Sequence, residues 1–242
     1  MKRVVSVAAL TCGLTICIGL TAVMDTGLPS SGRVPSSGHL SREERRRMIE
    51  AVVIGIANYN DVYKRLPGAI HRDAMGRPLS SWRFLILPFV AAGWPKHDLS
   101  VPWYDPANWA VASRRPVFYC FERRRSGGRS FDTNVLAVTG PGTAFDEHQA
   151  YSLGQLDGDT ALVLEVCETG LHWMEPGDIE VVDLRQSFTS GLDGAGVHVG
   201  FADGEVWFLS ARVPVDKLKE FFLVQRAKAI DRGKVLEEYR LP

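Results

Sequence analysis

Six histidines are the residues best suited to metal or acid–base chemistry, and they are scattered along the chain: His39, His71, His97, His148, His172 and His198. They show neither the His-Glu-x-x-His spacing nor the paired cysteines that are typical of zinc sites. His198 lies beside a predicted turn and is the strongest candidate for a ligand or a base, but the sequence supplies no companion groups for it. We therefore expect a histidine on a strand face that is satisfied by its neighbours.

Carboxylates near two predicted turns are the other groups that could hold an ion. Asp157, Asp159 and Asp203 offer the hard oxygen ligands that calcium prefers, but their spacing differs from the EF-hand loop, and turn formation explains them. The chain also lacks Gly-x-Ser-x-Gly, Walker and Gly-x-Gly-x-x-Gly motifs. We expect no catalytic residue, no metal ion and no cofactor.

Four of the six tryptophans fall within 28 residues: Trp82, Trp94, Trp103 and Trp109. Aromatic side chains at this density can line a groove for a sugar or another ligand. They can equally fill a core beneath a loop-rich region. The first interpretation makes these four residues candidate ligand-binding residues.

The charge balance bears on the class of partner. The chain has 28 basic and 28 acidic side chains among 242 residues and therefore no net charge. Proteins that bind nucleic acids usually show a basic excess or a basic stripe. The composition argues against a nucleic-acid partner.

The N-terminus resembles a membrane-targeting segment. Lys2 and Arg3 precede Val4–Met24, 21 residues without a charge, which is long enough to cross a bilayer as a helix. We expect residues 1–24 to be an uncleaved signal anchor, the alternative being a removed signal peptide. A Ser/Gly/Pro-rich linker over 25–40 would then lead to an exported domain over 41–242. The expected location is the cytoplasmic membrane, single-pass, with this domain periplasmic or extracellular.

Two cysteines lie in the predicted exported domain. Cys120 and Cys167 both stand on predicted strands, and an exported location would permit oxidation. A disulfide requires neighbouring strands with Cα atoms within about 7 Å. Otherwise the two residues would act as small buried thiols.

A helix is predicted from Ser41 to Tyr63. Ser41 and Glu44 have the spacing of a capping box, and apolar residues follow at helical spacing as far as Tyr59. Arg42, Arg45, Arg46, Arg47 and Glu50 are expected on the solvated side. Pro67-Gly68 would end the element.

A β-hairpin is predicted over Gly196–Ser210. Asp203-Gly204 between two apolar runs indicates a two-residue turn, with Gly204 at positive φ. Val197, Val199 and Phe201 would share one face, and His198, Gly200 and Ala202 the other. A hairpin this apolar requires other elements to cover it.

Further elements complete the expected domain. Ser80–Val90 is predicted as a buried strand or a short helix, and strands are predicted at Val117–Phe121, Thr133–Thr139, Ala161–Val166 and Ile179–Leu184. An amphipathic helix is predicted over 214–232, with Pro214 in its first turn and Gly233 as its stop.

Several segments, in order, resemble a known family. They are Asn58–Tyr63, Leu66-Pro67, Ser81–Arg83 with Leu87-Pro88, Pro102–Asn108, Val117–Cys120, Leu156–Gly158, Glu165, Trp173–Pro176, Asp178, and Val199–Gly204 with Phe208-Leu209. The set resembles the bacterial prepilin-type, type II secretion G-like proteins with a domain of unknown function, also known as bacterial extracellular solute-binding protein family ten. The resemblance covers roughly residues 45–210.

The resemblance implies an α+β, pilin-like fold, with an N-terminal helix packed on an antiparallel β-sheet, and it supplies no catalytic residues. The chain departs from that family in lacking the prepilin cleavage motif before its apolar segment. The linker also interrupts the long helix that is usual in such proteins. The family's terminal histidine corresponds to Asp193 here.

Three functions are compatible with these features. The first is a non-enzymatic, pseudopilin-like structural or assembly protein, with protein assembly partners or self-association. The second is an extracellular module that binds a carbohydrate or another ligand through the tryptophan-rich stretch. The third is an envelope hydrolase, which has the least support because the sequence shows no nucleophile or metal set.

Overall fold

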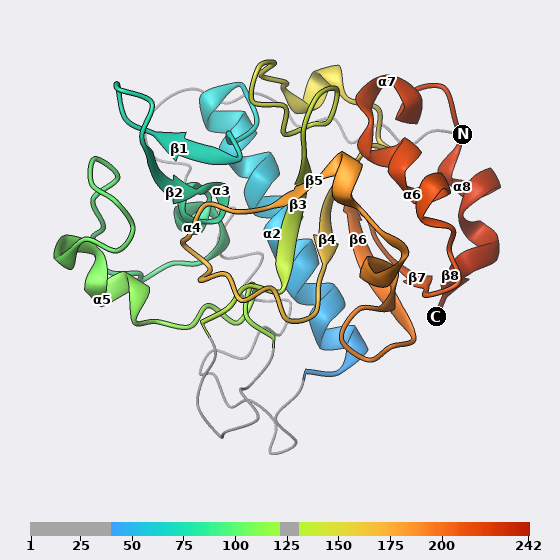
Figure 1. Ribbon diagram of the computed structural model, residues 1–242, viewed down its shortest axis with the longest axis horizontal. Helices are drawn as coiled ribbons and strands as arrows, with labels where there is room; N and C mark the ends of the chain where they lie inside the picture. The colour runs from blue at the N-terminus through green and yellow to red at the C-terminus, as the bar shows by residue number, and fades with distance from the viewer. Residues whose placement is uncertain (1–39, 122–130) are drawn as a thin grey trace. The chain divides into compact units, whose positions relative to one another are not determined.

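The computed structural model describes residues 40–121 and 131–242, and its first element is a long helix, α2 (Arg42–Tyr63) (Figure 1). A complete capping box starts this helix. Oγ of Ser41 accepts from the backbone N of Glu44 at 3.2 Å, and the Glu44 carboxylate accepts from the backbone N of Ser41 at 2.7 Å. Lys64 ends the helix in the left-handed region, at a φ of 58°. The predicted helix is confirmed.

A six-stranded sheet forms the second layer, in the order β5-β3-β4-β6-β7-β8. Every neighbouring pair is antiparallel except β3 and β5, which are parallel. Together with the helices this mixed sheet confirms the predicted α+β class. The strands are β3 (Val135–Thr139), β4 (Ala161–Glu165), β5 (Ile179–Glu180), β6 (Gly196–Phe201), β7 (Val206–Ser210) and β8 (Arg240–Leu241).

The β6–β7 hairpin lies inside this sheet, as predicted. Its register runs from Gly196 opposite Ser210 to Gly200 opposite Val206. Gly204 has a φ of 93°, but the connecting loop is longer than two residues. Oδ1 of Asp203 accepts from the backbone N of Glu205 at 2.9 Å, and this side-chain turn widens the loop to 202–205. The predicted two-residue turn is therefore wrong.

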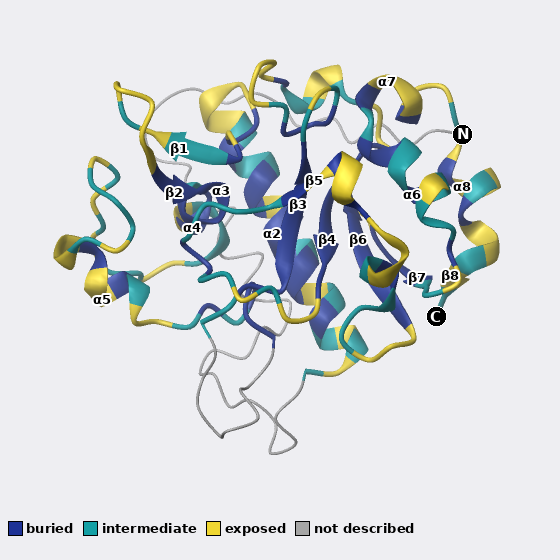
Figure 2. Cartoon of the chain, in the orientation of Figure 1, coloured by how far each residue is buried: buried dark blue, intermediate teal, exposed yellow. Residues whose placement is uncertain are grey.

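The two faces of β6 are covered by different elements. Val197, Val199 and Phe201 belong to an apolar core that includes the C-terminal residues Leu218 and Phe221. The opposite face packs under α2, where Val53 and Ile49 approach the backbone of Gly200. Strands β3, β4 and β6 are consequently buried at every residue (Figure 2).

Gly200 sets how closely α2 approaches the sheet. A Cβ atom at this position would lie 2.6 Å from Cγ2 of Val53 and 2.9 Å from Cγ2 of Val163. We expect Gly200→Val to lower the free energy of unfolding by about 1–3 kcal/mol, because the helix and the sheet must separate. Chemical denaturation measures this. The control Gly154→Val, where a Cβ meets no atom within 4 Å, should change stability by less than about 0.5 kcal/mol. Equal stability of the two variants would contradict the close approach.

A smaller unit follows α2 in the chain. Strands β1 (Ile70–Arg72) and β2 (Pro78–Ser81) form a separate antiparallel pair. The short helices α3 (Trp82–Leu85), α4 (Leu87–Val90) and α5 (Trp109–Ala112) come next. The predicted element over Ser80–Val90 is thus the end of a strand followed by two short helices. The β1–β2 hairpin and α5 lie on the same side of the molecule (Figure 1).

The predicted C-terminal helix over 214–232 begins as expected, but it is not continuous, because the chain forms shorter helices here. These are α6 (Val215–Phe222), α7 (Val224–Ala227) and α8 (Arg232–Val235). Leu223 is extended and bridges Thr143, and the backbone N of Val224 donates to the carbonyl of Gly142 at 2.9 Å. These tertiary hydrogen bonds replace helical ones. Gly233 lies inside α8 and does not end a helix.

Two predicted strands also need correction. At Val117–Phe121 the backbone N atoms of Tyr119 and Cys120 both donate to the carbonyl of Pro116, which makes a turn. The strand predicted over Ile179–Leu184 is limited to the two residues of β5, and a 3₁₀ turn follows over Val181–Asp183.

The predicted single-pass membrane location and transmembrane anchor are contradicted by the structure. Across 40–121 and 131–242, every helix is too short or too polar to cross a bilayer. Residues 1–24, on which that prediction was based, and nearly all of the predicted linker lie outside the described residues.

Candidate functional site

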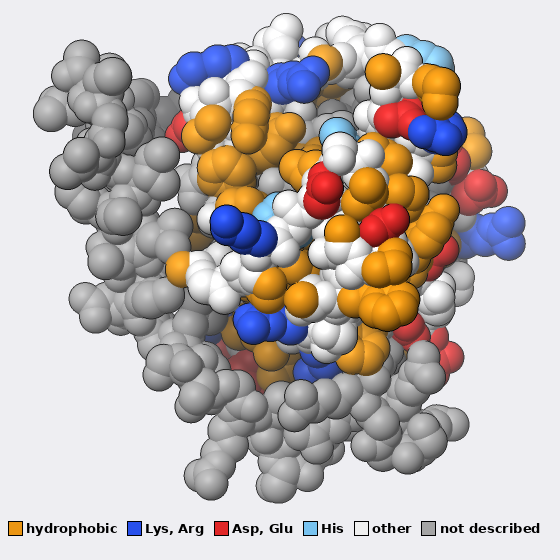
Figure 3. Space-filling model, turned by 90° about the vertical axis from the view of Figure 1, so that its left-hand side faces the viewer, with side chains coloured by type: hydrophobic (Ala, Val, Ile, Leu, Met, Phe, Trp, Pro, Cys, Tyr) orange, Lys and Arg blue, Asp and Glu red, His pale blue; other side chains and the backbone are white. Residues whose placement is uncertain are grey.

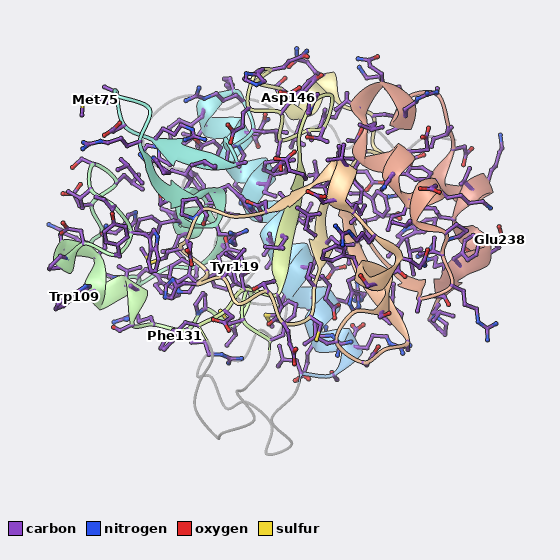
Figure 4. All side chains as sticks on the ribbon, in the orientation of Figure 1. Met75, Trp109, Tyr119, Phe131, Asp146 and Glu238 are labelled. Carbon is purple, nitrogen blue, oxygen red and sulfur yellow. The ribbon has the colours of Figure 1, made fainter. Side chains whose placement is uncertain are left out.

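The four candidate tryptophans do not share one groove. Trp82 is fully buried, and Trp94 and Trp103 are half-buried. Trp94 packs edge-on against Phe118, with 6.3 Å between ring centroids. Trp109, on α5, is 62% exposed and points outward (Figure 4). The stretch is part core and part surface, so neither sequence interpretation holds for all four residues.

Trp82 belongs to a buried polar cluster, here called the Arg83 cluster (Ser81, Trp82, Arg83, Tyr119, Asp178). Oδ1 of Asp178 accepts from Nη1 of Arg83 at 2.9 Å and from Nε1 of Trp82 at 3.0 Å. The Tyr119 hydroxyl donates to the carbonyl of Arg83, and Oγ of Ser81 donates to the carbonyl of Trp173. Residues from three of the separate sequence segments that resemble the family therefore contact one another in this cluster.

The Arg83 guanidinium also binds backbone oxygen atoms. It donates to the carbonyls of Trp173, Glu175 and Gly177 at 2.9–3.1 Å, and these residues form the loop before β5. Arg83 is fully buried, and five donors in a fixed fork suit it to tie a loop to a helix. The geometry gives Arg83 a structural role.

The same cluster covers the edge of β3 that β5 leaves unpaired. The backbone N of Ala137 donates to Asp178 at 2.8 Å, and the carbonyl of Val135 accepts from Arg83 at 3.3 Å. Burial raises the pKa of Asp178, and the neighbouring Arg83 opposes that rise. The side chains of Arg83 and Asp178 thus supply hydrogen-bond partners for backbone groups of β3 that a longer edge strand would otherwise supply.

A second buried set, here called the Arg45 cluster (Arg45, Glu165, Asp193, His198), joins α2 to the sheet. Nε of Arg45 lies 3.0 Å from Oε1 of Glu165, an ion pair without hydrogen-bond alignment. Nη2 of Arg45 donates to Asp193 at 2.9 Å. Nδ1 of His198 donates to Glu165, because a carboxylate only accepts. His198 therefore lies on a strand face, as predicted, and one of its two ring nitrogens has a partner.

The residue types of this cluster would suit an acid–base site, but the groups are buried where a substrate does not reach them. Glu165 and His198 are fully buried, and Arg45 is 5% exposed. Nε2 of His198 has no partner and the ring packs against Phe208, with 4.7 Å between centroids. A general base must reach a substrate proton, and this one faces protein on every side. The predicted exposed position of Arg45 is wrong, because its side chain points into the helix–sheet interface.

Asp193 stands at the position where the resemblance places a histidine. It lies at the surface end of the Arg45 cluster, 3.7 Å from Arg42. Partial burial would raise its pKa, but bonds from the Ala195 backbone and from Arg45 hold the pKa of Asp193 below its usual value. The residue is a counterion for the start of α2.

Two of the three aspartates weighed as calcium ligands, Asp159 and Asp203, are paired with an arginine, and Asp157 accepts from the backbone N of Asp159. Arg232 contacts Asp203 at 2.5 Å, Asp159 at 3.4 Å and Glu205 at 3.3 Å. Its guanidinium lies over the rings of Phe201 and Trp207. Within the described ranges no group of three or more histidine, cysteine and acidic side chains could hold a metal ion.

The two candidate cysteines are in different environments. Cys120 is fully buried and Cys167 is exposed, so the structure does not contain the candidate disulfide. Burial raises the pKa of Cys120 to about 12, which makes its thiol unreactive at neutral pH.

An aromatic stack leads from the core toward α5. His172 is stacked on Trp103, with 4.6 Å between centroids and an interplanar angle of 14°, and Phe131 stacks on it at 5.9 Å. Beyond this stack, Nε1 of Trp109 donates to the carbonyl of Tyr104 at 3.2 Å, and Tyr104 is 65% exposed. Figure 3 views the side of the molecule on which α5 lies and shows hydrophobic side chains over much of it.

His172 makes this stack sensitive to acid. Nδ1 accepts from the backbone N of Met174 at 3.2 Å, so Nε2 carries the proton and donates to the carbonyl of Ala112. Burial lowers the pKa of His172. Its contribution to stability is therefore complete above about pH 6.5 and is lost as the pH falls through the lowered value.

We expect the free energy of unfolding to fall as the pH drops below about 6.5 in the wild type, and to fall less in His172→Gln. Urea unfolding followed by tryptophan emission measures both. His148→Gln, which changes an exposed histidine, should retain the wild-type profile. A His172→Gln profile identical to that of the wild type would show that another group controls the acid response.

The sequence contained a signal for one member of the Arg45 cluster. Arg45 lies four residues before Ile49 and seven before Val52, on the buried stripe of α2. That spacing could have placed it in the interface. Its partners Glu165 and Asp193 are distant in sequence, and no local pattern links them.

The fold and these clusters define an α+β protein whose charged interior joins a helix to a mixed sheet. A family model described as a protein of unknown function, DUF1559, matches residues 42–165, just over half of the chain. The chain belongs to this family. A search of curated proteins found no match, and neither did a search of solved structures.

Proposed function

We propose that the chain is a pseudopilin-like structural or assembly protein, similar to prepilin-type, type II secretion G-like proteins. It works through protein contacts, self-association among them, and carries out no catalysis. The long helix on an antiparallel core of strands is the arrangement that the resemblance implies.

The burial of the polar clusters is the observation that carries this proposal. Glu165, His198, Arg83 and Asp178 are the groups whose types fit catalysis, and their side chains are at most 3% exposed. Each is bonded to another structural element, so each contributes to holding the fold. Catalytic groups need contact with substrate, and these groups favour a scaffold instead.

Sedimentation velocity of the purified full-length chain over a wide concentration range tests the proposal. We expect the mean mass to rise with concentration, because association is governed by mass action. A chain that remains monomeric at every concentration would contradict self-association.

A ligand-binding module is the second candidate, favoured by the exposed Trp109 and Tyr104. Indole and phenol rings held at a surface can stack on a sugar ring. An oligosaccharide titration followed by tryptophan emission should then give saturable quenching that Trp109→Ala removes. Tyr63→Ala, which changes a 53% exposed aromatic residue on α2, should leave the quenching unchanged. Absence of quenching in the wild type would exclude this candidate for the sugars tested.

A further inference from the structure

An apolar tip forms where a 3₁₀ turn (Pro106–Asn108) leads into α5, at the outer edge of the molecule (Figure 1). Five exposed residues, here called the α5 tip, make it up: Tyr104, Pro106, Ala107, Trp109 and Ala110. Trp109 is 62% exposed and Tyr104 is 65% exposed, although both rings are largely apolar. An exposed apolar patch commonly marks a contact with another protein or with a membrane. The α5 tip is therefore a candidate contact surface.

The N–H groups of the α5 tip already have acceptors close by in the sequence. The indole Nε1 of Trp109 donates to the carbonyl of Tyr104 at 3.2 Å. Pro106 has no N–H group. The other bonded donors, all with acceptors in residues 102–106, are the backbone N atoms of Asp105, Ala107, Asn108 and Trp109. These groups can leave water without losing a hydrogen bond, so the tip can enter an apolar medium.

The same property disfavours a sugar or a protein groove as the occupant of this surface. Binding sites for sugars and proteins use directional hydrogen bonds to fix the bound molecule. The α5 tip has few polar groups left for this, because its donors are occupied and the residues beside the two rings are proline and alanine. Tryptophan and tyrosine, in contrast, are enriched at the membrane–water interface. The composition of the tip favours a lipid surface.

The charges beside the α5 tip suit a phospholipid headgroup. The backbone N of Asp98 donates to Oδ1 of Asn108 at 2.8 Å, which holds the stretch that carries Lys96 against the tip. Lys96 and Arg114 are exposed and form no ion pair within the described residues. The carboxylates of Asp98 and Asp105 accept hydrogen bonds within their own turns. Lipid phosphates would pair with the two cations, and the balance of two cations and two carboxylates makes an anionic lipid unnecessary.

We propose that the α5 tip inserts into the interfacial region of a phospholipid bilayer, with the rings of Trp109 and Tyr104 at the level of the headgroups. The contact is peripheral, because the tip enters one leaflet only, to a depth of about 5–10 Å. This inference goes beyond the proposed function and does not depend on self-association.

Quenching of tryptophan emission by bromine atoms on lipid acyl chains tests the contact in the full-length chain. The six tryptophans all lie at or after Trp82, so residues 1–39 contribute no emission, whatever they bind. Phosphatidylcholine vesicles with brominated chains should quench the emission relative to the same vesicles without bromine. Trp109→Phe should lose most of this quenching. Trp94→Phe, which changes a half-buried tryptophan, is the matched control and should keep it.

A second pair of variants leaves every tryptophan in place. Ala110→Asp adds a charge to the α5 tip, and it should reduce the quenching at least about threefold because a carboxylate resists entry into a bilayer. Ala74→Asp makes the same change at an exposed alanine in the β1–β2 turn and should be quenched as the wild type is. Circular dichroism checks that all the variants fold.

The inference is overturned if the vesicles do not quench the wild type, or if they quench Trp109→Phe or Ala110→Asp as strongly as the wild type. Emission that responds to an oligosaccharide or to a partner protein, but not to brominated vesicles, would assign the tip to that other class of partner instead. None of these results measures self-association, so each leaves the proposed assembly function standing.

Discussion

Replacing Arg83 by methionine is expected to lower the free energy of unfolding by about 3–5 kcal/mol. The substitution leaves Asp178 buried without its cationic partner and removes the donors that hold the loop before β5. The carbonyl of Val135, on the edge of β3, also loses its hydrogen bond from Arg83. Urea denaturation at neutral pH measures the change.

Two further variants make this prediction specific. Arg77→Met changes an arginine whose side chain is 69% exposed, and it should alter stability by less than about 1 kcal/mol. The double variant Arg83→Met/Asp178→Asn removes both charges and should be more stable than Arg83→Met alone. If the double variant is less stable than the single one, the buried charge of Asp178 is not the cause.

The second large effect is expected at Glu165. Glu165→Gln keeps the shape of the side chain but removes the charge that faces both Arg45 and His198. The buried guanidinium then retains Asp193, at the surface end of the cluster, as its anionic partner and the carbonyl of Leu40 as a neutral acceptor. We expect a loss of about 3 kcal/mol in the free energy of unfolding, measured by chemical denaturation.

Glu43→Gln is the matched control for this change. Glu43 also pairs with arginines, Arg46 and Arg47, but its side chain is 52% exposed. Exposed helix pairs contribute about 0.3–0.5 kcal/mol, so the control should remain close to the wild type. Comparable losses in the two variants would mean that burial does not determine the effect.

The local features of the fold were predictable because short-range physics determines them. The capping box at Ser41 and the alternation along β6 each involve residues within a few positions of one another. The break at Leu223 was not predictable, because the carbonyl of Gly142, far away in the sequence, supplies the competing hydrogen bond.

In the two clusters, too, local features were predictable from the sequence and long-range contacts were not. The place of His198 on a strand face was predictable, but its partner Glu165 is 33 residues away. Arg83 lies among apolar residues, and its acceptors lie between 52 and 95 residues further along the chain. The exposure of Trp109 and the burial of Trp82 likewise depend on tertiary packing, since both stand in similar aromatic surroundings in the sequence.

The two-residue strands at both margins of the sheet have a consequence for behaviour at high concentration. A long unpaired margin recruits strands from other molecules and seeds cross-β fibrils. Here β5 and β8 offer few backbone groups for such recruitment, and at the β5 margin the Arg83 cluster occupies backbone groups of the next strand, β3. Amyloid growth from the native state is therefore disfavoured at the sheet margins. Dense solutions of the folded protein should not bind thioflavin.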